Sequence, residues 1–376
     1  MLHSHNSILS TLKRWVRVGA FVLVLFAFSV SLSVAWPDSA SAARESRLPQ
    51  GNPIKDGRSL LQYALPIDNS AIRRVQLELE EIDAPLRGRR WGTIKNQLST
   101  ASRVLGLRRT DILEAIPEER QPDAEALLSA IETEIEALQS ATEAEDKEQI
   151  SSIQSAALDH VGELEALMVQ GFPFEVPEEY SNLPQLKGRA TIEMTTEQGS
   201  VRMLLDGYSA PVTAGNFVDL VQRGFYNGLQ FTRAEESYVL QAGDPPGSEE
   251  GFIDPKTKQY RAIPLEILVR SDSEPIYGFT LEEIGRYREQ PVLPFSVYGT
   301  VAMARPEADA NGASSQFFFF LFQPELTPAG LNLLDGRYAV FGYVTQGKDV
   351  LGQLKQGDTI KSMKVVSGAE NLVKPR

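Results

Sequence analysis

The chain of 376 residues contains no cysteine. This absence excludes disulfide bonds, thiol nucleophiles and metal sites built from cysteine ligands. It does not identify the compartment in which the protein works.

Histidine is almost as scarce, at three residues. His3 and His5 precede a predicted cleavage site, and His160 lies in a predicted helix, where a surface or core imidazole is the simplest interpretation. A single remaining histidine cannot build a multi-histidine metal site, and a Ser-His-Asp triad would have only His160 to use. We therefore expect a protein without a metal ion or other cofactor, whose chemistry does not depend on histidine.

Basic residues are too few to balance the acidic ones, and the formal net charge is −13. The first 42 residues carry +2 of this total, so the rest of the chain carries −15. An acidic surface argues against nucleic acid as a partner, because phosphate contacts need a basic face. It also argues against peripheral binding to anionic lipid.

The first 42 residues have the layout of a secretory signal peptide. Lys13, Arg14 and Arg17 form a positive region, residues 18–34 are apolar, and Ala40-Ser41-Ala42 fits the small-x-small cleavage pattern. The alternative is a retained membrane anchor, because the apolar run approaches spanning length; the protein would then reach the membrane only through this segment. No twin-arginine pair is present, which favours the general secretory route. We expect an exported protein, soluble after cleavage, that works in the periplasm or in a thylakoid lumen.

Residues 58–170 predict an antiparallel helical bundle. Asp68-Asn69-Ser70 offers a helix cap, and Gln121-Pro122-Asp123 opens a long helix with proline in its first turn. Between them we expect one helix over residues 89–105 and a short one from Asp111. Apolar residues spaced three or four apart indicate one buried stripe per helix. The stripes are best explained as the core of the bundle, although its surface can also bind a partner.

From Gly188 the apolar pattern changes to period two, which predicts strands. The sequence thus divides into a signal peptide (1–42), a flexible lead-in (43–57), the helical bundle (58–170), a proline-containing linker (171–187) and a strand-rich domain (188–376). The expected fold class is α+β. Nothing in the sequence suggests an obligate oligomer, so we expect a monomer.

Two short apolar runs near the C-terminus, Ser315–Phe322 and Tyr338–Gly342, predict strands. Together with the segments FTR at 231–233, YVLQAGD at 238–244, AMAR at 302–305 and LDGR at 334–337, they resemble the active-site strands of cyclophilins. The likeness covers roughly residues 190–373, and the whole chain resembles the large multidomain cyclophilins of the thylakoid lumen of plants and cyanobacteria. The resemblance implies a closed antiparallel β-barrel with two helices.

The resemblance also implies a peptidyl-prolyl cis-trans isomerase and its site. The implied catalytic residues are Arg233, Gln241 and Phe318, and the implied substrate-binding residues are Tyr238, Val239, Ala304, Arg305, Gln316, Leu333, Leu334 and Tyr338. Arg233 would donate to the twisted prolyl amide with a planar fork that lysine cannot imitate. Gln241 and Gln316 would orient Arg233 and the peptide backbone, and the apolar residues would enclose the prolyl ring.

Several positions depart from the family pattern. Thr232 and Tyr338 stand where the family usually has histidine, Tyr238 and Val239 replace Phe and Met, and Arg305 replaces Asn. Leu333 replaces the tryptophan of cyclosporin-sensitive members. We therefore expect weak or absent cyclosporin binding, because the indole N–H donor and its large face are gone.

These departures keep three interpretations open. The first is an isomerase that assists the folding or assembly of exported or lumenal proteins, for which the resemblance implies photosystem II subunits as clients. The second is a binding module that holds Xaa-Pro segments of its clients without useful turnover. The third is autoinhibition, in which the bundle covers the pocket; an unchanged peptide affinity and rate after removal of residues up to about 185 would exclude it.

The segment from Ser248 to Pro294 is longer than a minimal cyclophilin needs. In it we expect a barrel strand over Ile263–Ile267 and a surface helix over Thr280–Tyr287 that starts at a threonine cap.

Overall fold

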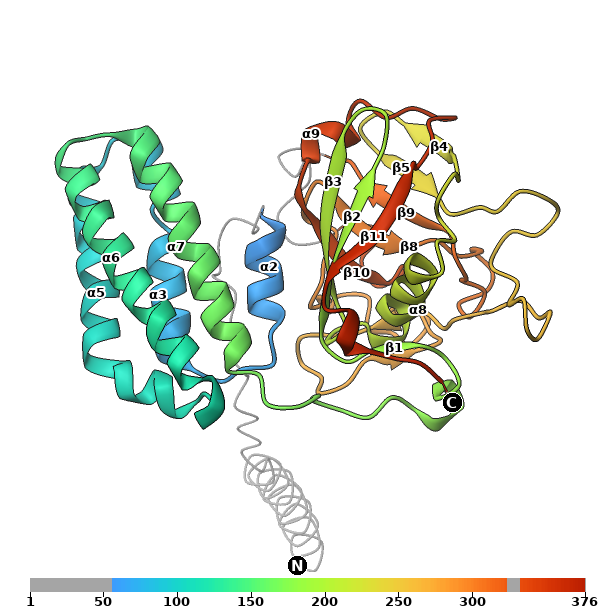
Figure 1. Cartoon of the computed structure of the whole chain (residues 1–376), viewed down its shortest axis with the longest axis horizontal. Coiled ribbons are helices and arrows are strands. Elements are labelled where there is room, and N and C mark those ends of the chain that lie inside the picture. Colours follow the sequence, from blue (N-terminus) through green and yellow to red (C-terminus); the bar gives the residue numbers. More distant parts are fainter. Residues whose placement is uncertain (1–55, 323–331, 376) are drawn as a thin grey trace, which may run out of the picture. The chain divides into compact units, whose positions relative to one another are not determined.

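The computed structural model describes residues 56–322 and 332–375 (Figure 1). The predicted signal peptide and nearly all of the predicted lead-in lie outside the described residues. No helix in these two ranges is both long enough and apolar enough to cross a membrane.

The first part of the described chain is helical, as predicted. Its helices are α2 (Gly57–Ala64), α3 (Ser70–Glu80), α4 (Asp83–Arg87), α5 (Trp91–Glu114), α6 (Gln121–Glu143) and α7 (Lys147–Leu167). Asn69 caps α3 as expected, since its side-chain oxygen accepts from the backbone N–H groups of Ala71 and Ile72 at 3.1 and 3.0 Å. The two helices expected over residues 89–105 and from Asp111 are instead one, α5, with non-helical backbone angles at Arg108. The apolar pattern is interrupted at this kink, but the backbone continues as one helix with no loop between its two parts.

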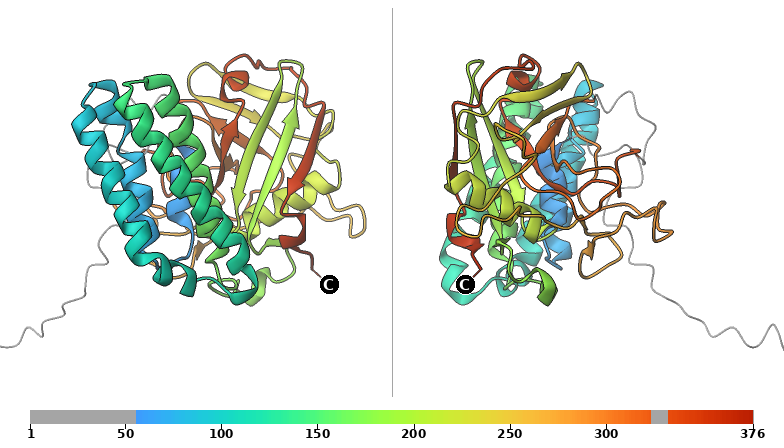
Figure 2. Two further views of the ribbon diagram at one scale, coloured as in Figure 1. Left: turned by 60° about the vertical axis from the view of Figure 1, so that its left-hand side comes forward. Right: turned by 90° about the vertical axis from the view of Figure 1, so that its right-hand side faces the viewer.

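The long helices α5, α6 and α7 lie alongside one another (Figure 2), with α3 packed on α5 and α7. Their predicted apolar stripes form one core, in which Leu128, Ile131 and Ile135 of α6 are buried. The residues that carry the helix periodicity are therefore the residues that exclude water.

Helix α2 differs from the others because its apolar residues do not join this core. Leu60 and Leu61 are buried in a cluster with Phe318, Phe320 and Tyr343 of the strand-rich part. The Arg189 guanidinium also donates to the backbone oxygen of Leu61. Helix α2, at the start of the described chain, thus packs on strands that come much later in the sequence.

The strand-rich part contains one eight-stranded antiparallel sheet, in the order β11-β2-β3-β10-β8-β9-β5-β4. These strands are β2 (Arg189–Thr195), β3 (Ser200–Asp206), β4 (Phe231–Glu235), β5 (Val239–Ala242), β8 (Thr300–Met303), β9 (Phe317–Phe320), β10 (Val340–Gln346) and β11 (Ser362–Ser367). Two helices accompany them, α8 (Pro211–Gln222) and α9 (Lys348–Leu351). A short pair, β1 (Gln185–Leu186) with β12 (Leu372–Val373), stands apart from this sheet.

The predicted closed barrel is wrong, because the sheet forms a curled half-barrel that stays open between β4 and β11. In the described chain, an isolated bridge between Gln230 and Thr359 and a few backbone hydrogen bonds cross that seam, but no ladder of paired strand residues does. The backbone of β4 is instead contacted by the turn before β11, where Phe231 N donates to Asp358 O at 2.9 Å. Since β11 itself starts at Ser362 and pairs with β2, no ladder continues around the barrel.

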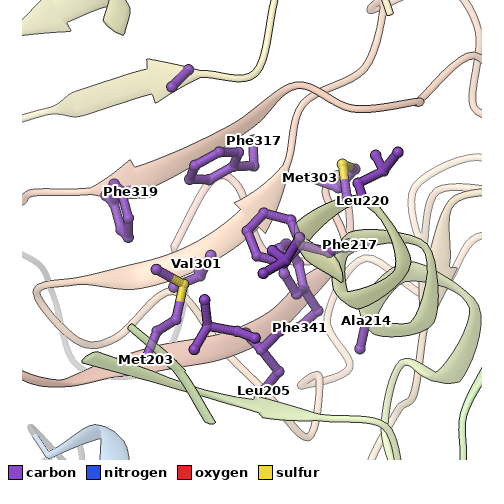
Figure 3. Close-up of a cluster of buried hydrophobic side chains, with 14 of the residues drawn as sticks. Met203, Leu205, Ala214, Phe217, Leu220, Val301, Met303, Phe317, Phe319 and Phe341 are labelled. Carbon is purple, nitrogen blue, oxygen red and sulfur yellow. The ribbon is translucent and has the colours of Figure 1, made fainter. Parts of the chain in front are cut away.

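The hollow of the sheet holds an aromatic core around α8 (Figure 3). Phe217 of α8 lies 5.0 Å from Phe317 and 5.1 Å from Phe341, measured between ring centroids. Successive side chains of a strand point to opposite faces. Phe317 and Phe319 of β9 accordingly enter this inner core, whereas Phe318 and Phe320 enter the separate cluster on the outer face.

The long segment between β5 and β8 is built differently from the prediction. Only Glu266–Ile267 of the expected strand is a strand of a sheet, while Ile263 forms an isolated bridge with Ala313; this strand, β6, pairs with β7 (Ile276–Tyr277) in a separate two-stranded sheet. Residues 280–287 form turns and not a helix. The expected cap is present, since Thr280 and Glu283 exchange hydrogen bonds, but Gly285 has a φ of +74° that ends the helical geometry at once.

A buried carboxylate joins this segment to α8. Glu266 accepts hydrogen bonds from the N–H groups of Val212 and Thr213 at 3.2 and 2.9 Å, in the first turn of α8. A carboxylate is favourable there because the first N–H groups of a helix lack partners inside the helix. Burial raises the pKa of Glu266 to about 7.

Candidate active site

The three predicted catalytic residues lie in one row across neighbouring strands. Arg233 of β4 is opposite Gln241 of β5, and Gln241 is opposite Phe318 of β9. The row continues to Ala302 of β8. Directly opposed residues of an antiparallel pair present their side chains on the same face. The sheet register therefore brings a cation, an amide and an aromatic ring together on the outer face.

Apolar residues of the prediction surround the Phe318 ring. Val239 and Phe318 are buried members of the outer cluster, and Ala304, Leu334 and Tyr338 are partly buried against it. The rings of Phe318 and Tyr338 meet edge to face, with centroids 5.5 Å apart and planes at 88°. Such a geometry is favourable for two aromatic rings. The structure thus brings five of the predicted site residues together in one mostly apolar set.

The two predicted glutamines form a polar edge beside this set. Gln241 Nε2 donates to Gln316 Oε1 at 2.7 Å. Gln316 Nε2 in turn donates to Asp244 Oδ1 at 3.2 Å and to the backbone oxygen of Glu250 at 2.8 Å. Burial, with the nearby charge of Glu250, raises the pKa of Asp244. The chain of contacts fixes the orientation of both amides.

Arg233 is held by a partner that the sequence analysis did not consider. Its Nε donates to Glu235 Oε1 at 2.7 Å and a terminal nitrogen approaches the same oxygen at 2.6 Å. Both side chains are about half exposed, at 49% and 50%. Residues two apart on a strand share a face, so this pairing was readable from the spacing. An ion pair so open to water is weak, and Arg233 can exchange it for another hydrogen-bond acceptor.

Arg305 lies at the rim on the side of Tyr338. Its guanidinium donates to the backbone oxygens of Arg337 and Pro306 at 2.9 Å each. The same group stacks over the Tyr338 ring, 5.3 Å from the centroid. Arg305 is thereby a positive charge held in place beside the Tyr338 ring.

Two predicted substrate-binding residues stand apart from the apolar set. Leu333 is 88% exposed, and Tyr238 is 38% exposed with its ring edge-on to Phe320 at 6.1 Å. The leucine at the position of the family's tryptophan therefore points away from the surface that surrounds Phe318.

Two residues that the sequence did not predict support this set: Phe295 contacts it directly, and Asp335 holds the Phe295 backbone. Phe295 packs on Phe318, and Asp335 accepts from Phe295 N at 2.8 Å and from Asn332 N at 3.2 Å. Burial raises the pKa of Asp335 to about 6. Phe295 has no short-range sequence signal, because it comes from the irregular segment before β8.

Comparison with known proteins assigns the family. The sequence model of the cyclophilin-type peptidyl-prolyl cis-trans isomerases matches residues 191–370. Residues 56–169 match a domain described as the PsbQ-like domain of CYP38-like peptidyl-prolyl cis-trans isomerases. A putative thylakoid lumen peptidyl-prolyl cis-trans isomerase of Synechocystis sp. is 58% identical over 326 residues, which are 87% of this chain and 86% of the relative. The chain belongs to the cyclophilin-type isomerase family.

A second sequence relative agrees with this assignment. The chloroplastic peptidyl-prolyl cis-trans isomerase CYP38 of Arabidopsis thaliana is 44% identical over 360 residues, covering 91% of this chain and 82% of the relative. Among solved structures, a cyclophilin-type isomerase of Cryptosporidium parvum is 22% identical with a TM-score of 0.35, covering 48% of this chain and 98% of that one. The resemblance to this family expected from the strand motifs is confirmed by the sequence relatives.

The family's chemistry needs little from its catalyst. Rotation about a prolyl amide meets a barrier of roughly 18–20 kcal/mol, because resonance in the amide is lost. Catalysis requires a pocket for the ring and a donor that favours the twisted amide over the planar one. Neither a nucleophile nor a proton relay is involved. The groups on the outer face of this sheet that could take part are the Arg233 guanidinium, the amides of Gln241 and Gln316 and the Phe318 ring.

Proposed function

We propose that this cyclophilin isomerises Xaa-Pro bonds of exported client proteins in a thylakoid lumen. Arg233 is the donor to the twisted amide, Gln241 and Gln316 hold the peptide backbone, and Phe318 is the platform under the prolyl ring. The observation that carries this assignment is the row in which Arg233, Gln241 and Phe318 oppose one another across three strands.

Two observations support the lumenal location and its clients. The first 42 residues have the pattern of a secretory signal peptide, and the 58% identical relative carries a thylakoid lumen name. The resemblance to lumenal cyclophilins implies photosystem II subunits as clients. The acidic helical bundle offers a second surface for such a partner.

The experiment is an isomerisation assay of residues 43–376 on a series of Xaa-Pro peptides, with Arg233→Ala as the test variant. Arg202→Ala is the matched control, because Arg202 is also a half-exposed strand arginine paired with a glutamate, Glu193, at 2.9 Å. We expect a rate above background that falls at least about tenfold in Arg233→Ala only. Equal rates in all three proteins would show that Arg233 is not the donor.

A catalytically weak peptide-binding module is the second candidate. The observation that favours it is the pairing of Arg233 with Glu235, which occupies the donor in the absence of peptide. Titration of the same peptides, followed by fluorescence polarisation, separates the candidates. Binding without turnover in the unmodified chain would favour the module.

A further inference from the structure

Phe295 is a large apolar residue that is buried although it lies in a loop. It lies in the irregular segment between β7 and β8, outside any strand, yet only 2% of it is exposed. Connecting segments usually run over the surface and carry few buried large side chains. A fully buried ring in such a segment needs a reason in its contacts.

Those contacts are with the outer face of β9. The Phe295 ring is nearly parallel to that of Phe318, at 8° and 5.9 Å between centroids. It meets Phe320 edge to face at 5.4 Å. Phe318 therefore has Phe295 parallel to its plane and Tyr338 at its edge. Since closely packed rings cannot change rotamer without displacing a neighbour, these two residues limit where the Phe318 ring can go.

The backbone of Phe295 is fixed on both sides by the turn at residues 332–337. Its N–H donates to Asp335 Oδ1 at 2.8 Å, and its carbonyl accepts from Asn332 Nδ2 at 3.0 Å. Asn332 also receives the Leu334 N–H at 3.0 Å. The turn that carries Leu334 and the residue that contacts Phe318 thus form one hydrogen-bonded unit.

We propose that Phe295 is a positioning residue for the prolyl site, which holds the Phe318 ring at the orientation that receives the substrate. This inference rests on the proposed function, because it takes Phe318 as the platform for the ring. Asp335 supports this placement indirectly, because its side chain accepts a hydrogen bond from the Phe295 backbone. The long segment before β8 then positions the Phe318 ring through Phe295, although none of its residues was among the predicted site residues.

The test compares Phe295→Leu with Phe252→Leu in the chain of residues 43–376. Phe252 is a similarly buried phenylalanine, 6% exposed, whose ring contacts Phe225 at 5.4 Å in the inner core and not Phe318. Both leucine variants lose one ring and so are expected to lose comparable stability. Only Phe295→Leu should weaken the Kd for an Xaa-Pro peptide, by about five- to tenfold, with KM rising more than kcat falls. Asp335→Asn, which keeps one of two acceptor oxygens, should shift Kd in the same direction but less.

A second readout needs no peptide. The Phe318 ring resonance, assigned through Phe318→Leu in protein with ¹³C-labelled phenylalanine, should move in Phe295→Leu and stay unchanged in Phe252→Leu. An unmoved resonance, or equal Kd values for the two leucine variants, would overturn the positioning role. If the unmodified chain neither bound nor turned over any peptide while the resonance still moved, the proposed function would fail and the placement of Phe318 by Phe295 would stand.

Discussion

The buried carboxylate of Glu266 makes the stability of this protein depend on pH in a predictable direction. Its side chain is 1% exposed, and burial raises its pKa from the usual 4.5 to about 7. A group whose pKa is higher in the folded protein contributes stability that is present below the unfolded pKa and is lost as pH rises through the folded pKa. The free energy of unfolding should therefore fall between pH 5 and pH 8.

The magnitude follows from the two pKa values. With an unfolded pKa of 4.5 and a folded pKa of about 7, one such group contributes about 2.5 kcal/mol more at pH 5 than at pH 8. Glu165, also raised to about 7, and Asp335, raised to about 6, add to the same trend. The Glu266→Gln variant loses only the part of the pH dependence of the unfolding free energy that Glu266 contributes, because glutamine does not titrate.

Urea unfolding followed by circular dichroism at pH 5, 6.5 and 8 measures the contribution of Glu266 to the pH dependence of the unfolding free energy. The difference in unfolding free energy between pH 5 and pH 8 should be about 2.5 kcal/mol smaller in Glu266→Gln than in the unmodified chain. Glu197→Gln is the control, since Glu197 is exposed and should leave the pH trend unchanged. Parallel pH dependences of the Glu266→Gln variant and the unmodified chain would refute the reasoning.

Two further predictions concern the site and its support. Glu235→Gln removes the charged partner of Arg233 and should raise kcat/KM by no more than about fivefold, because an exposed pair is worth about 1 kcal/mol at most; a fall in the isomerisation rate would show that Glu235 assists the reaction. Leu60→Ala removes a side chain that is 2% exposed in the cluster shared with Phe318 and Phe320 and should cost about 2–5 kcal/mol of unfolding free energy, measured by urea titration. A loss below about 1 kcal/mol would mean that α2 contributes little to that cluster.

Local patterns predicted much of this fold. Asn69 and Pro122 marked two helix starts because capping and proline geometry act within a few residues. The aromatic run of the β9 segment predicted a strand, and the two-residue period of the strand backbone then places its phenylalanines on two faces. The failures were equally local. The Thr280–Glu283 cap is present, but the positive φ of Gly285 ends the helical geometry before the predicted helix can form.

The predicted site residues came from the family motifs, which lie on strands and in the turn at residues 334–337. Phe295, Asp335 and Glu235 were missed for two different reasons. Glu235 shares a strand face with Arg233, so its role was available from spacing. Phe295 reaches Phe318 from 23 positions earlier in the chain, and no periodicity of either segment indicates that contact.

The sequence by itself determined the export pattern, the helix-then-strand order, the absence of cysteine chemistry and the family. These properties depend on composition or on residues close together in the chain. Tertiary structure decided that the sheet stays open between β4 and β11 and that α2 packs on the outer face of the strands. It also decided that a loop phenylalanine lies against the prolyl platform. Each of these depends on how distant segments exclude water together, and burial of apolar surface is non-directional, so local patterns do not specify the partner.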